Sequence, residues 1–190
     1  PYTNGILHAT TAFGKTVTAA AIIARKKVNT LILVHSKALL KQWHDRLTEF
    51  LNIDYPKHEE KNKRGRRKVF SPIGCFDSSG NTLHGIIDIA LIQSCLDEDG
   101  VKPFLQDYGM VIVDECHHVS SITFEQVLMS IKVHTIYGLT ATPIRKDGHQ
   151  PIIFMQCGPI RFSTDVKSQI AKQSFDRFLI PRFTSYNSIL

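Results

Sequence analysis

An eight-residue segment near the start of the chain carries the residue types of a phosphate-binding loop. It reads Ala-Thr-Thr-Ala-Phe-Gly-Lys-Thr over residues 9–16 and lies between a short apolar run and an alanine-rich, helix-forming stretch. In such a loop, backbone N–H groups bind phosphate oxygens, a lysine reaches the β and γ phosphates, and a hydroxyl ligates magnesium. Lys15 and Thr16 suit the last two roles. The candidate nucleotide-binding residues are Thr11, Ala12, Phe13, Gly14, Lys15 and Thr16.

A second candidate site follows the apolar run Met110–Val113, which continues directly into Asp114 and Glu115. Carboxylates at the end of a buried strand are costly unless a cation meets them, and a magnesium-bound triphosphate would supply that cation. Asp114 then suits a magnesium ligand, direct or through water, and Glu115 suits a base that orients the attacking water. Two alternatives remain open. The acids could cap the next helix, or the Cys-His-His triplet at 116–118 could bind zinc, although adjacent residues rarely converge on one ion.

Short apolar runs alternate with helix-like segments along most of the chain. The runs that predict strands are 5–9, 30–34, 86–92, 110–113, 135–139 and 152–155, and the segments that predict helices are 15–25, 36–51 and 121–131. Near-continuous apolar strands separated by helices predict an α/β fold with a mostly parallel sheet and helices on both faces. Ligands bind at the carboxyl ends of strands in such a fold, which is where both candidate sites are expected.

Length and composition predict one domain with a sizeable core, because 190 residues with 43% hydrophobic side chains can offset the entropy of folding. We place this domain at residues 1–160, and a linker or docking segment at 161–190, where the alternating pattern weakens. The longest apolar run has six residues, Ala19–Ala24, so no membrane span is expected. The first residues do not resemble a secretory signal. Because residue 1 is proline, we expect the chain to come from a longer protein.

Charge and cysteine usage point to a partner and a compartment. The net charge is +6, and residues 57–68 hold seven basic and two acidic side chains. Such a cluster repels itself unless a polyanion neutralises it, so nucleic-acid phosphate is a natural partner, and a solvated loop is the alternative. The four cysteines form no Cys-x-x-Cys pair. Their spacing predicts no zinc framework and favours a reducing, cytoplasmic location.

The segment Asp-Glu-Cys-His at 114–117 resembles motif II of the superfamily 2 helicases, the DEAD/DEAH-box group in the broad sense. The resemblance is greatest to the XPB-like and type III restriction helicase branch, in which motif III precedes a charged triplet. The other motifs follow in family order: motif I at 10–16, motif Ia at 33–43, a later nucleic-acid motif at 87–94, motif III (Gly-Leu-Thr-Ala-Thr-Pro) at 138–143 and the charged triplet at 145–147.

This resemblance implies the first RecA-like lobe of an ATP-dependent helicase or translocase that uses ATP and Mg²⁺ and grips nucleic acid, here expected to be DNA. The implied role lies in repair, restriction or mobile-element defence. Nothing after Pro143 resembles motifs V and VI, so the lobe is expected to need a second RecA-like lobe and to be a poor ATPase alone. By this resemblance the catalytic residues are Lys15, Asp114, Glu115 and His117, the magnesium-binding residues are Thr16 and Asp114, and the nucleic-acid coupling residues are His35, Gln93, Thr140 and Thr142.

Two other functions remain open. A P-loop phosphotransferase would need an acceptor pocket and a lid, and it would leave motif III without an explanation. A degenerate lobe that binds nucleic acid without hydrolysing ATP is suggested by two departures from the family, Thr10 in place of proline and Ala12 in place of glycine. The intact Lys15, Asp114 and Glu115 favour hydrolysis.

Overall fold

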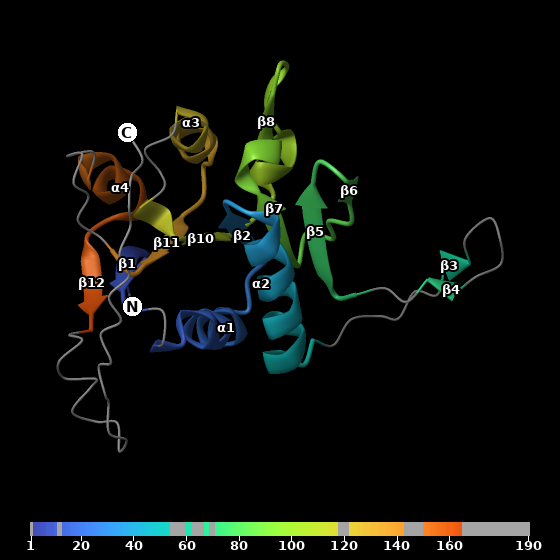
Figure 1. Cartoon of the computed structure of the whole chain (residues 1–190), viewed down its shortest axis with the longest axis horizontal. Helices are drawn as coiled ribbons and strands as arrows, with labels where there is room; N and C mark the ends of the chain where they lie inside the picture. The colour runs from blue at the N-terminus through green and yellow to red at the C-terminus, as the bar shows by residue number, and fades with distance from the viewer. Residues whose placement is uncertain are drawn as a thin grey trace, which may run out of the picture.

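The computed structural model describes residues 2–10, 13–53, 60–61, 67–68, 71–117, 122–142 and 150–164. Within them, one large sheet has the strand order β12-β1-β11-β10-β2-β7-β5-β6 (Figure 1). Its strands in chain order are β1 Asn4–His8, β2 Thr30–Val34, β5 Ile73–Asp77, β6 Gly80–Asn81, β7 Ile87–Leu91, β10 Met110–Asp114, β11 Thr135–Thr140 and β12 Ile160–Ser163.

The sheet is parallel except at one edge, where β6 pairs antiparallel with β5. Consecutive strands β1 and β2 are separated by β11 and β10, so the chain crosses over through a helix, as parallel pairing requires. Two short antiparallel hairpins lie outside this sheet, β3 Glu60–Lys61 with β4 Arg67–Lys68 and β8 Leu96–Asp97 with β9 Gly100–Val101. Short 3₁₀ helices cover Ile92–Cys95 and Pro103–Gln106.

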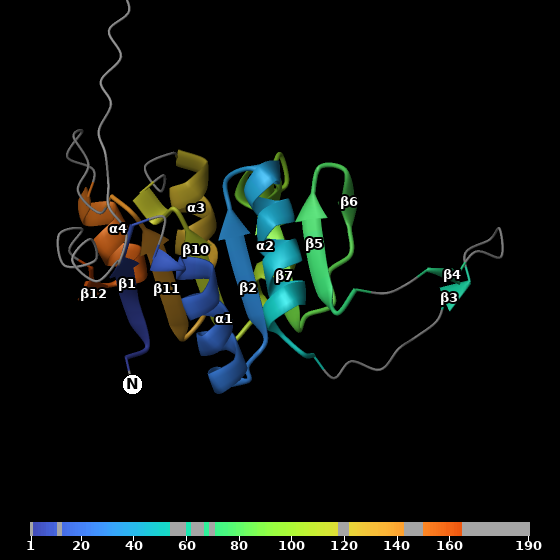
Figure 2. The ribbon, with the colours of Figure 1, turned by 60° about the horizontal axis from the view of Figure 1, so that its bottom comes forward.

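Helices cover both faces of the sheet. Figures 1 and 2 show α1 (Lys15–Lys26) and α2 (Lys37–Phe50) on one face and α3 (Ile122–Ser130) and α4 (Gln150–Cys157) on the other. The side chains of β2 alternate accordingly: Leu31 and Leu33 pack in the core under α3 and α4, and Ile32 and Val34 pack under α1 and α2. The α/β fold, with its mostly parallel sheet and helices on both faces, is therefore confirmed.

Helix α2 begins where the sequence indicates. Ser36 is its N-cap, and the side-chain oxygen accepts a hydrogen bond from the backbone N–H of Leu39 over 3.3 Å. Trp43 and Leu47, one turn apart, are buried against the sheet. The helix therefore fixes the indole of Trp43 in the core above β2 and β10.

The predicted strand at 152–155 is wrong, because these residues lie inside helix α4. A short apolar run does not distinguish a buried strand from a buried helix segment. Ile153 and Cys157, four residues apart, are buried, whereas Phe154 and Met155 between them are exposed. That spacing is helical and places one face of α4 on the core.

Two parallel strands of the large sheet, β5 and β12, were not predicted, and neither were the two-residue strands β3, β4, β6, β8 and β9. β5 contains glycine, cysteine and aspartate within five residues, so it gives no apolar run. β12, Ile160–Ser163, pairs in parallel with β1 and extends the sheet past residue 160, where the predicted domain ends. The predicted role of the following residues, 165–190, lies outside the described residues. In the described part of the chain, no helix is long and apolar enough to cross a membrane.

Candidate active site

The carboxyl ends of three neighbouring strands bring the two sequence-predicted sites together. β11 lies between β1 and β10, with Thr140 beside His8 on one side and Leu139 beside Asp114 on the other. The phosphate loop follows β1 and the acids lie at the end of β10, so both lie at the carboxyl ends of the strands, with only β11 between them. We call this side of the sheet its carboxyl edge. This is the edge at which ligands bind in parallel sheets.

The phosphate loop ends at Gly14, which is the N-cap of α1 and has φ 87° and ψ 40°. Glycine adopts this left-handed conformation without the steric penalty of a Cβ. Lys15 then begins the helix and is only 7% exposed, and Thr16 follows it, partly buried. The structure thus places Gly14, Lys15 and Thr16 at a helix N-terminus, where phosphate binding is favoured. Thr11 and Ala12 lie outside the described residues.

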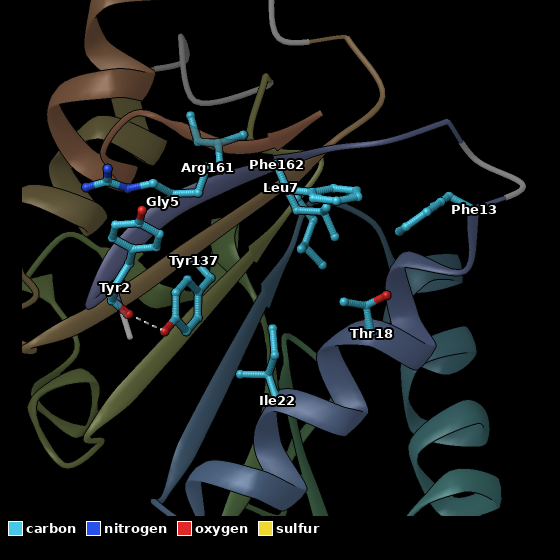
Figure 3. Close-up of a pocket in the computed structure, with 11 residues that line it drawn as sticks. Tyr2, Gly5, Leu7, Phe13, Thr18, Ile22, Tyr137, Arg161 and Phe162 are labelled. Atoms are coloured by element: carbon cyan, nitrogen blue, oxygen red, sulfur yellow. Dashed lines mark hydrogen bonds between the residues drawn. The ribbon is translucent and has the colours of Figure 1, made fainter. Parts of the chain in front are cut away.

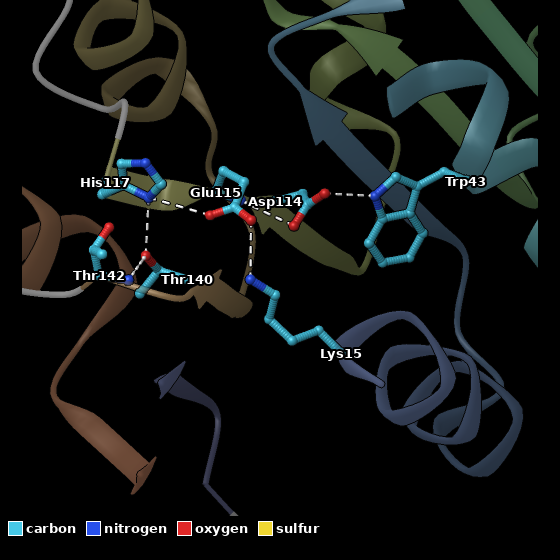
Figure 4. A network of polar contacts seen from close by, with 7 residues as sticks. All are labelled: Lys15, Trp43, Asp114, Glu115, His117, Thr140 and Thr142. Carbon is cyan, nitrogen blue, oxygen red and sulfur yellow. Dashed lines mark hydrogen bonds and ion pairs between the residues drawn. The ribbon is translucent and has the colours of Figure 1, made fainter. Parts of the chain in front are cut away.

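A buried ion pair links the phosphate loop to motif II. Lys15 Nζ lies 2.9 Å from Glu115 Oε1, and the side chains of the two residues are 8% and 18% exposed (Figure 4). Burial of an unpaired ammonium would be costly, so the carboxylate of Glu115 compensates the charge of Lys15. The two residues predicted to act on the same nucleotide are thus already in contact.

Asp114 is the most enclosed acid of the site, at 6% exposure. Its Oδ2 accepts a hydrogen bond from Trp43 Nε1 over 2.7 Å, and its Oδ1 accepts one from the backbone N–H of Glu115 over 3.0 Å (Figure 4). Burial raises the pKa of Asp114, and the charge of Glu115 adds to that rise, while the hydrogen bond from Trp43 opposes it. A cation beside this carboxylate would relieve the cost of its burial.

Motif II continues into motif III through a chain of polar contacts. Glu115 has the positive φ of 48°, uncommon for a residue with a Cβ. Its Oε2 lies 3.2 Å from His117 Nδ1, which is also 2.9 Å from Thr140 Oγ1. The backbone N–H of Thr142 donates to the same Thr140 oxygen over 3.0 Å. Figure 4 shows Lys15, Glu115, His117 and Thr140 as one connected network.

The other two predicted coupling residues meet at the carboxyl end of β2. Gln93 Nε2 donates to the backbone oxygen of His35 over 3.0 Å. His35 directly follows β2, and Gln93 lies in the 3₁₀ helix that follows β7. The predicted nucleic-acid positions therefore form two contacting groups, His35 with Gln93 and Thr140 with Thr142, on different strand ends. The role of these four residues in nucleic-acid coupling stays a prediction.

The residues of this edge fit a magnesium ion. Carboxylate and hydroxyl oxygens are the ligands that Mg²⁺ prefers, and it is usually held by one or two protein groups together with phosphates and waters. The buried carboxylate of Asp114, with one donor on each oxygen, meets this requirement. Among the described residues, no group of three or more His, Cys, Asp or Glu side chains could hold a metal ion. Cys116 is buried, and a hydrogen bond with Cys157 together with burial raises its pKa.

Phe13 packs against the edge strand β12. Its ring centroid lies 5.8 Å from that of Phe162, and both rings line an apolar cavity of about 330 Å³ beside α1 (Figure 3). Tyr137, Tyr2 and Ile22 line the cavity further from the loop. Phe13 therefore ties the phosphate loop to the sheet edge through aromatic packing.

Trp43 is the site residue that the sequence does not reveal. It lies on the apolar stripe of α2, which indicates core packing, and the ring is indeed 2% exposed. The hydrogen bond from its indole to Asp114, 71 residues further along the chain, has no signal in the sequence. The only available hint is that a buried indole N–H needs an acceptor.

Comparison with known proteins supports the motif assignment. The family model described as type III restriction enzyme, res subunit, matches residues 2–145. Protein 109L of Invertebrate iridescent virus 3, provisionally named a helicase, is 32% identical over 157 residues, which cover 81% of this chain and 44% of that protein. The DNA 3'-5' helicase XPB of Kineococcus radiotolerans is 27% identical over 175 residues, covering 87% of this chain and 28% of that protein. The chain spans less than half the length of these relatives.

Solved helicase structures share the fold. The helicase domain of Hef from Pyrococcus furiosus superposes with a TM-score of 0.67 at 16% identity, covering 93% of this chain and 39% of that one. The UvsW helicase of bacteriophage T4 gives a TM-score of 0.58 at 19% identity, covering 83% and 54%. The RecA-like architecture is therefore confirmed. With most of its residues matched by the family model, the chain belongs to the type III restriction enzyme res subunit family, as the first RecA-like lobe of a superfamily 2 helicase.

Proposed function

We propose that this lobe binds ATP with Mg²⁺ between Lys15 and Asp114 and hydrolyses it when a second RecA-like lobe completes the site. The observation that carries the proposal is the contact of 2.9 Å between Lys15 Nζ and Glu115 Oε1 at the shared edge of the sheet. A γ-phosphate placed against Lys15 would replace Glu115 as its partner. The carboxylate of Glu115 would then be free to orient and deprotonate the attacking water.

Magnesium has a defined place in this proposal. Thr16 and Asp114 would hold the ion, directly or through water, and the ion would supply charge stabilisation at the phosphates. Lys15 would bind the phosphate, and the N–H groups at the N-terminus of α1 would orient the phosphate. His117, Thr140 and Thr142 would couple the nucleotide to nucleic acid, because their contacts link Glu115 to the end of β11.

The proposed nucleic-acid partner is DNA. The restriction-enzyme family and the XPB relative favour DNA, whereas a relative of 28% identity from African swine fever virus is named for an RNA helicase activity. The proposed contacts are His35 after β2 and Gln93 after β7, together with the basic residues of 57–68. Most of that basic stretch lies outside the described residues. Competition between single-stranded DNA and RNA of equal length for the chain, measured at several salt concentrations, tests the preference, because phosphate contacts alone would not distinguish the two.

The domain limits and the setting of the protein complete the proposal. Residues 1–164 would form the lobe, and 165–190 would link or dock it to a second lobe of the full-length protein. All four cysteines are free thiols, three of them buried, which supports a reducing, cytoplasmic location. DNA repair and restriction are the proposed pathways. A P-loop phosphotransferase is not favoured, since motif II at the end of β10 and motif III at the end of β11 are those of helicases.

Calorimetry with Mg-ADP tests nucleotide binding on the 190-residue chain. Lys15→Ala should weaken binding at least tenfold, or about 1.4 kcal/mol, because a charge-assisted phosphate contact is lost. Arg25→Ala is the matched control, since it removes one positive charge from the exposed end of the same helix. Equal affinities of the wild type and Lys15→Ala would contradict the proposed site.

A further inference from the structure

Helix α2 gives one polar atom to the candidate magnesium site. Trp43 Nε1 donates to Asp114 Oδ2 over 2.7 Å, and the two residues are 2% and 6% exposed. Trp43 is the sole tryptophan of the chain. A hydrogen bond from a neutral donor to a carboxylate is stronger than one between two neutral groups, and burial of both partners strengthens it further.

The two donors on Asp114 differ in where they come from. The N–H of Glu115 belongs to the next residue of the same chain segment and moves with Asp114. Trp43 comes from another element, and its ring is fixed in the core between α2 and the sheet. The indole is therefore the contact that fixes the carboxylate of Asp114 relative to the rest of the lobe.

The contact leaves Asp114 able to bind a cation. Each oxygen of an ionised carboxylate has about two acceptor positions, and the structure gives each oxygen one donor. The neighbouring cation, Lys15, is paired with Glu115 and not with Asp114. One acceptor position on each oxygen thus remains for a metal ion or its waters.

We propose that Trp43 is a positioning residue for magnesium: its indole N–H holds the carboxylate of Asp114 in the orientation that the ion requires. This inference rests on the proposed function, because it assumes a magnesium nucleotide at this edge. Groups that hydrogen-bond to metal ligands commonly change metal affinity by about 10- to 100-fold when they are removed. Trp43 would have that role here.

A purely structural role for the same bond makes a different prediction. A buried indole N–H needs an acceptor, and Asp114 could serve only that need. In that case loss of the N–H would change the stability of the lobe without changing its response to magnesium. The two roles are separated by measuring ADP affinity with magnesium and with excess chelator.

The first experiment compares Trp43→Phe with the wild-type chain by calorimetry. Phenylalanine keeps an aromatic ring in the core and removes the donor. We expect ADP affinity in chelator to be unchanged, and the gain in affinity on adding magnesium to fall by about tenfold. Leu47→Ala is the control, because it damages the same buried face of α2 one turn away without removing a donor to Asp114. It should retain the full magnesium effect.

The second experiment needs no variant. Because there is a single tryptophan, a ¹⁵N-labelled chain gives one indole N–H resonance. It should shift on addition of Mg-ADP and move far less with ADP in chelator, and Mn²⁺ with ADP should broaden it strongly.

An identical magnesium effect in Trp43→Phe, or an indole resonance that ignores Mg-ADP, would overturn the inference while leaving the proposed function intact. Absence of ADP binding to the wild-type chain in both conditions would instead overturn the proposed function.

Discussion

Two aspartates are buried in the same sheet, and they differ in how completely the protein satisfies them. Asp88 is 0% exposed and is the second residue of β7, near the amino end of the strand. Asp114 is 6% exposed and is the last residue of β10, at the carboxyl end. One strand, β2, separates β7 from β10. The two acids therefore lie in one core but at opposite edges of the sheet.

The protein supplies three donors to Asp88, one more than it supplies to Asp114. Asp88 Oδ2 accepts from the backbone N–H of Gly85 and from the hydroxyl of Tyr108, both over 2.6 Å, and the N–H of His84 lies within 3.2 Å of both oxygens. Burial, and then the hydrogen bond to Asp88, raises the pKa of Tyr108, so its hydroxyl remains a donor. Asp88 thus anchors the turn before β7 and the loop before β10.

Asp114 has one donor on each oxygen, and burial raises its pKa. The carboxyl of Asp88 holds three donors from two loops and is a structural anchor. The carboxyl of Asp114 holds only two donors and is half satisfied, so an acceptor position on each oxygen is available to a cation. The half-satisfied acid lies at the carboxyl edge, where parallel sheets bind ligands.

The largest expected effect is the loss of stability in Asp88→Ala. Tyr108, which is buried, and the backbone N–H groups of His84 and Gly85, which are partly buried, lose their acceptor. Each loss costs about 1–3 kcal/mol, so the free energy of unfolding should fall by at least about 3 kcal/mol. Asp114→Ala should cost about 1–3 kcal/mol less, because two donors lose their partner instead of three. Urea unfolding without nucleotide measures both.

Asp99→Ala, at an exposed acid, is the control and should change stability by less than about 0.5 kcal/mol. Equal losses in Asp88→Ala and Asp114→Ala would remove the distinction between anchor and binding group. The two variants should rank in the opposite order for ADP binding. Asp114→Ala should lose the magnesium-dependent part of ADP binding, whereas Asp88→Ala, if folded, should keep it.

A smaller effect is expected from crowding Asp88 without replacing it. A Cβ on Gly74 would lie 2.0 Å from Asp88 Oδ1 and 2.5 Å from the backbone oxygen of Thr82. Gly74→Ala must therefore displace the carboxyl group or the hairpin, at a cost of about 1–3 kcal/mol. Gly80→Ala, in the same hairpin, meets nothing within 4 Å and should be nearly neutral. Thermal unfolding of both variants checks the difference, and a neutral Gly74→Ala would show that the anchor tolerates movement.

Local signals explain which parts of this architecture could be predicted from the sequence. The phosphate loop and the acids of motif II are contiguous segments, and each follows an apolar run, so their residue types and spacing identify them. The helix starting after Ser36 was predictable for the same reason, since its cap and its apolar stripe lie within one segment. The sheet edge at which they meet follows from the α/β pattern.

Contacts between distant segments could not be predicted. Asp88 interrupts an apolar run, and nothing in that run indicates that Tyr108, 20 residues away, donates to it. Trp43 and Asp114 are 71 residues apart, and the apolar stripe of α2 indicates only that Trp43 is buried. The run at 152–155 became a helix because its burial is decided by packing on β1 and β11, which periodicity over four residues does not encode.

The smallest expected effect is that of Tyr108→Phe, the counterpart of Trp43→Phe at the other aspartate. Both variants remove one donor from a buried carboxyl and keep an aromatic ring. Asp88 retains the backbone donors of His84 and Gly85, so the free energy of unfolding should fall by only about 1 kcal/mol. ADP affinity should not change, with or without magnesium, because Asp88 lies at the amino ends of the strands, opposite the proposed nucleotide site. Urea unfolding and calorimetry on the same preparations measure the two quantities. A magnesium-specific loss of ADP affinity in Tyr108→Phe would mean that the amino edge of the sheet also sets the geometry of the site, and the contrast between the two aspartates would fail.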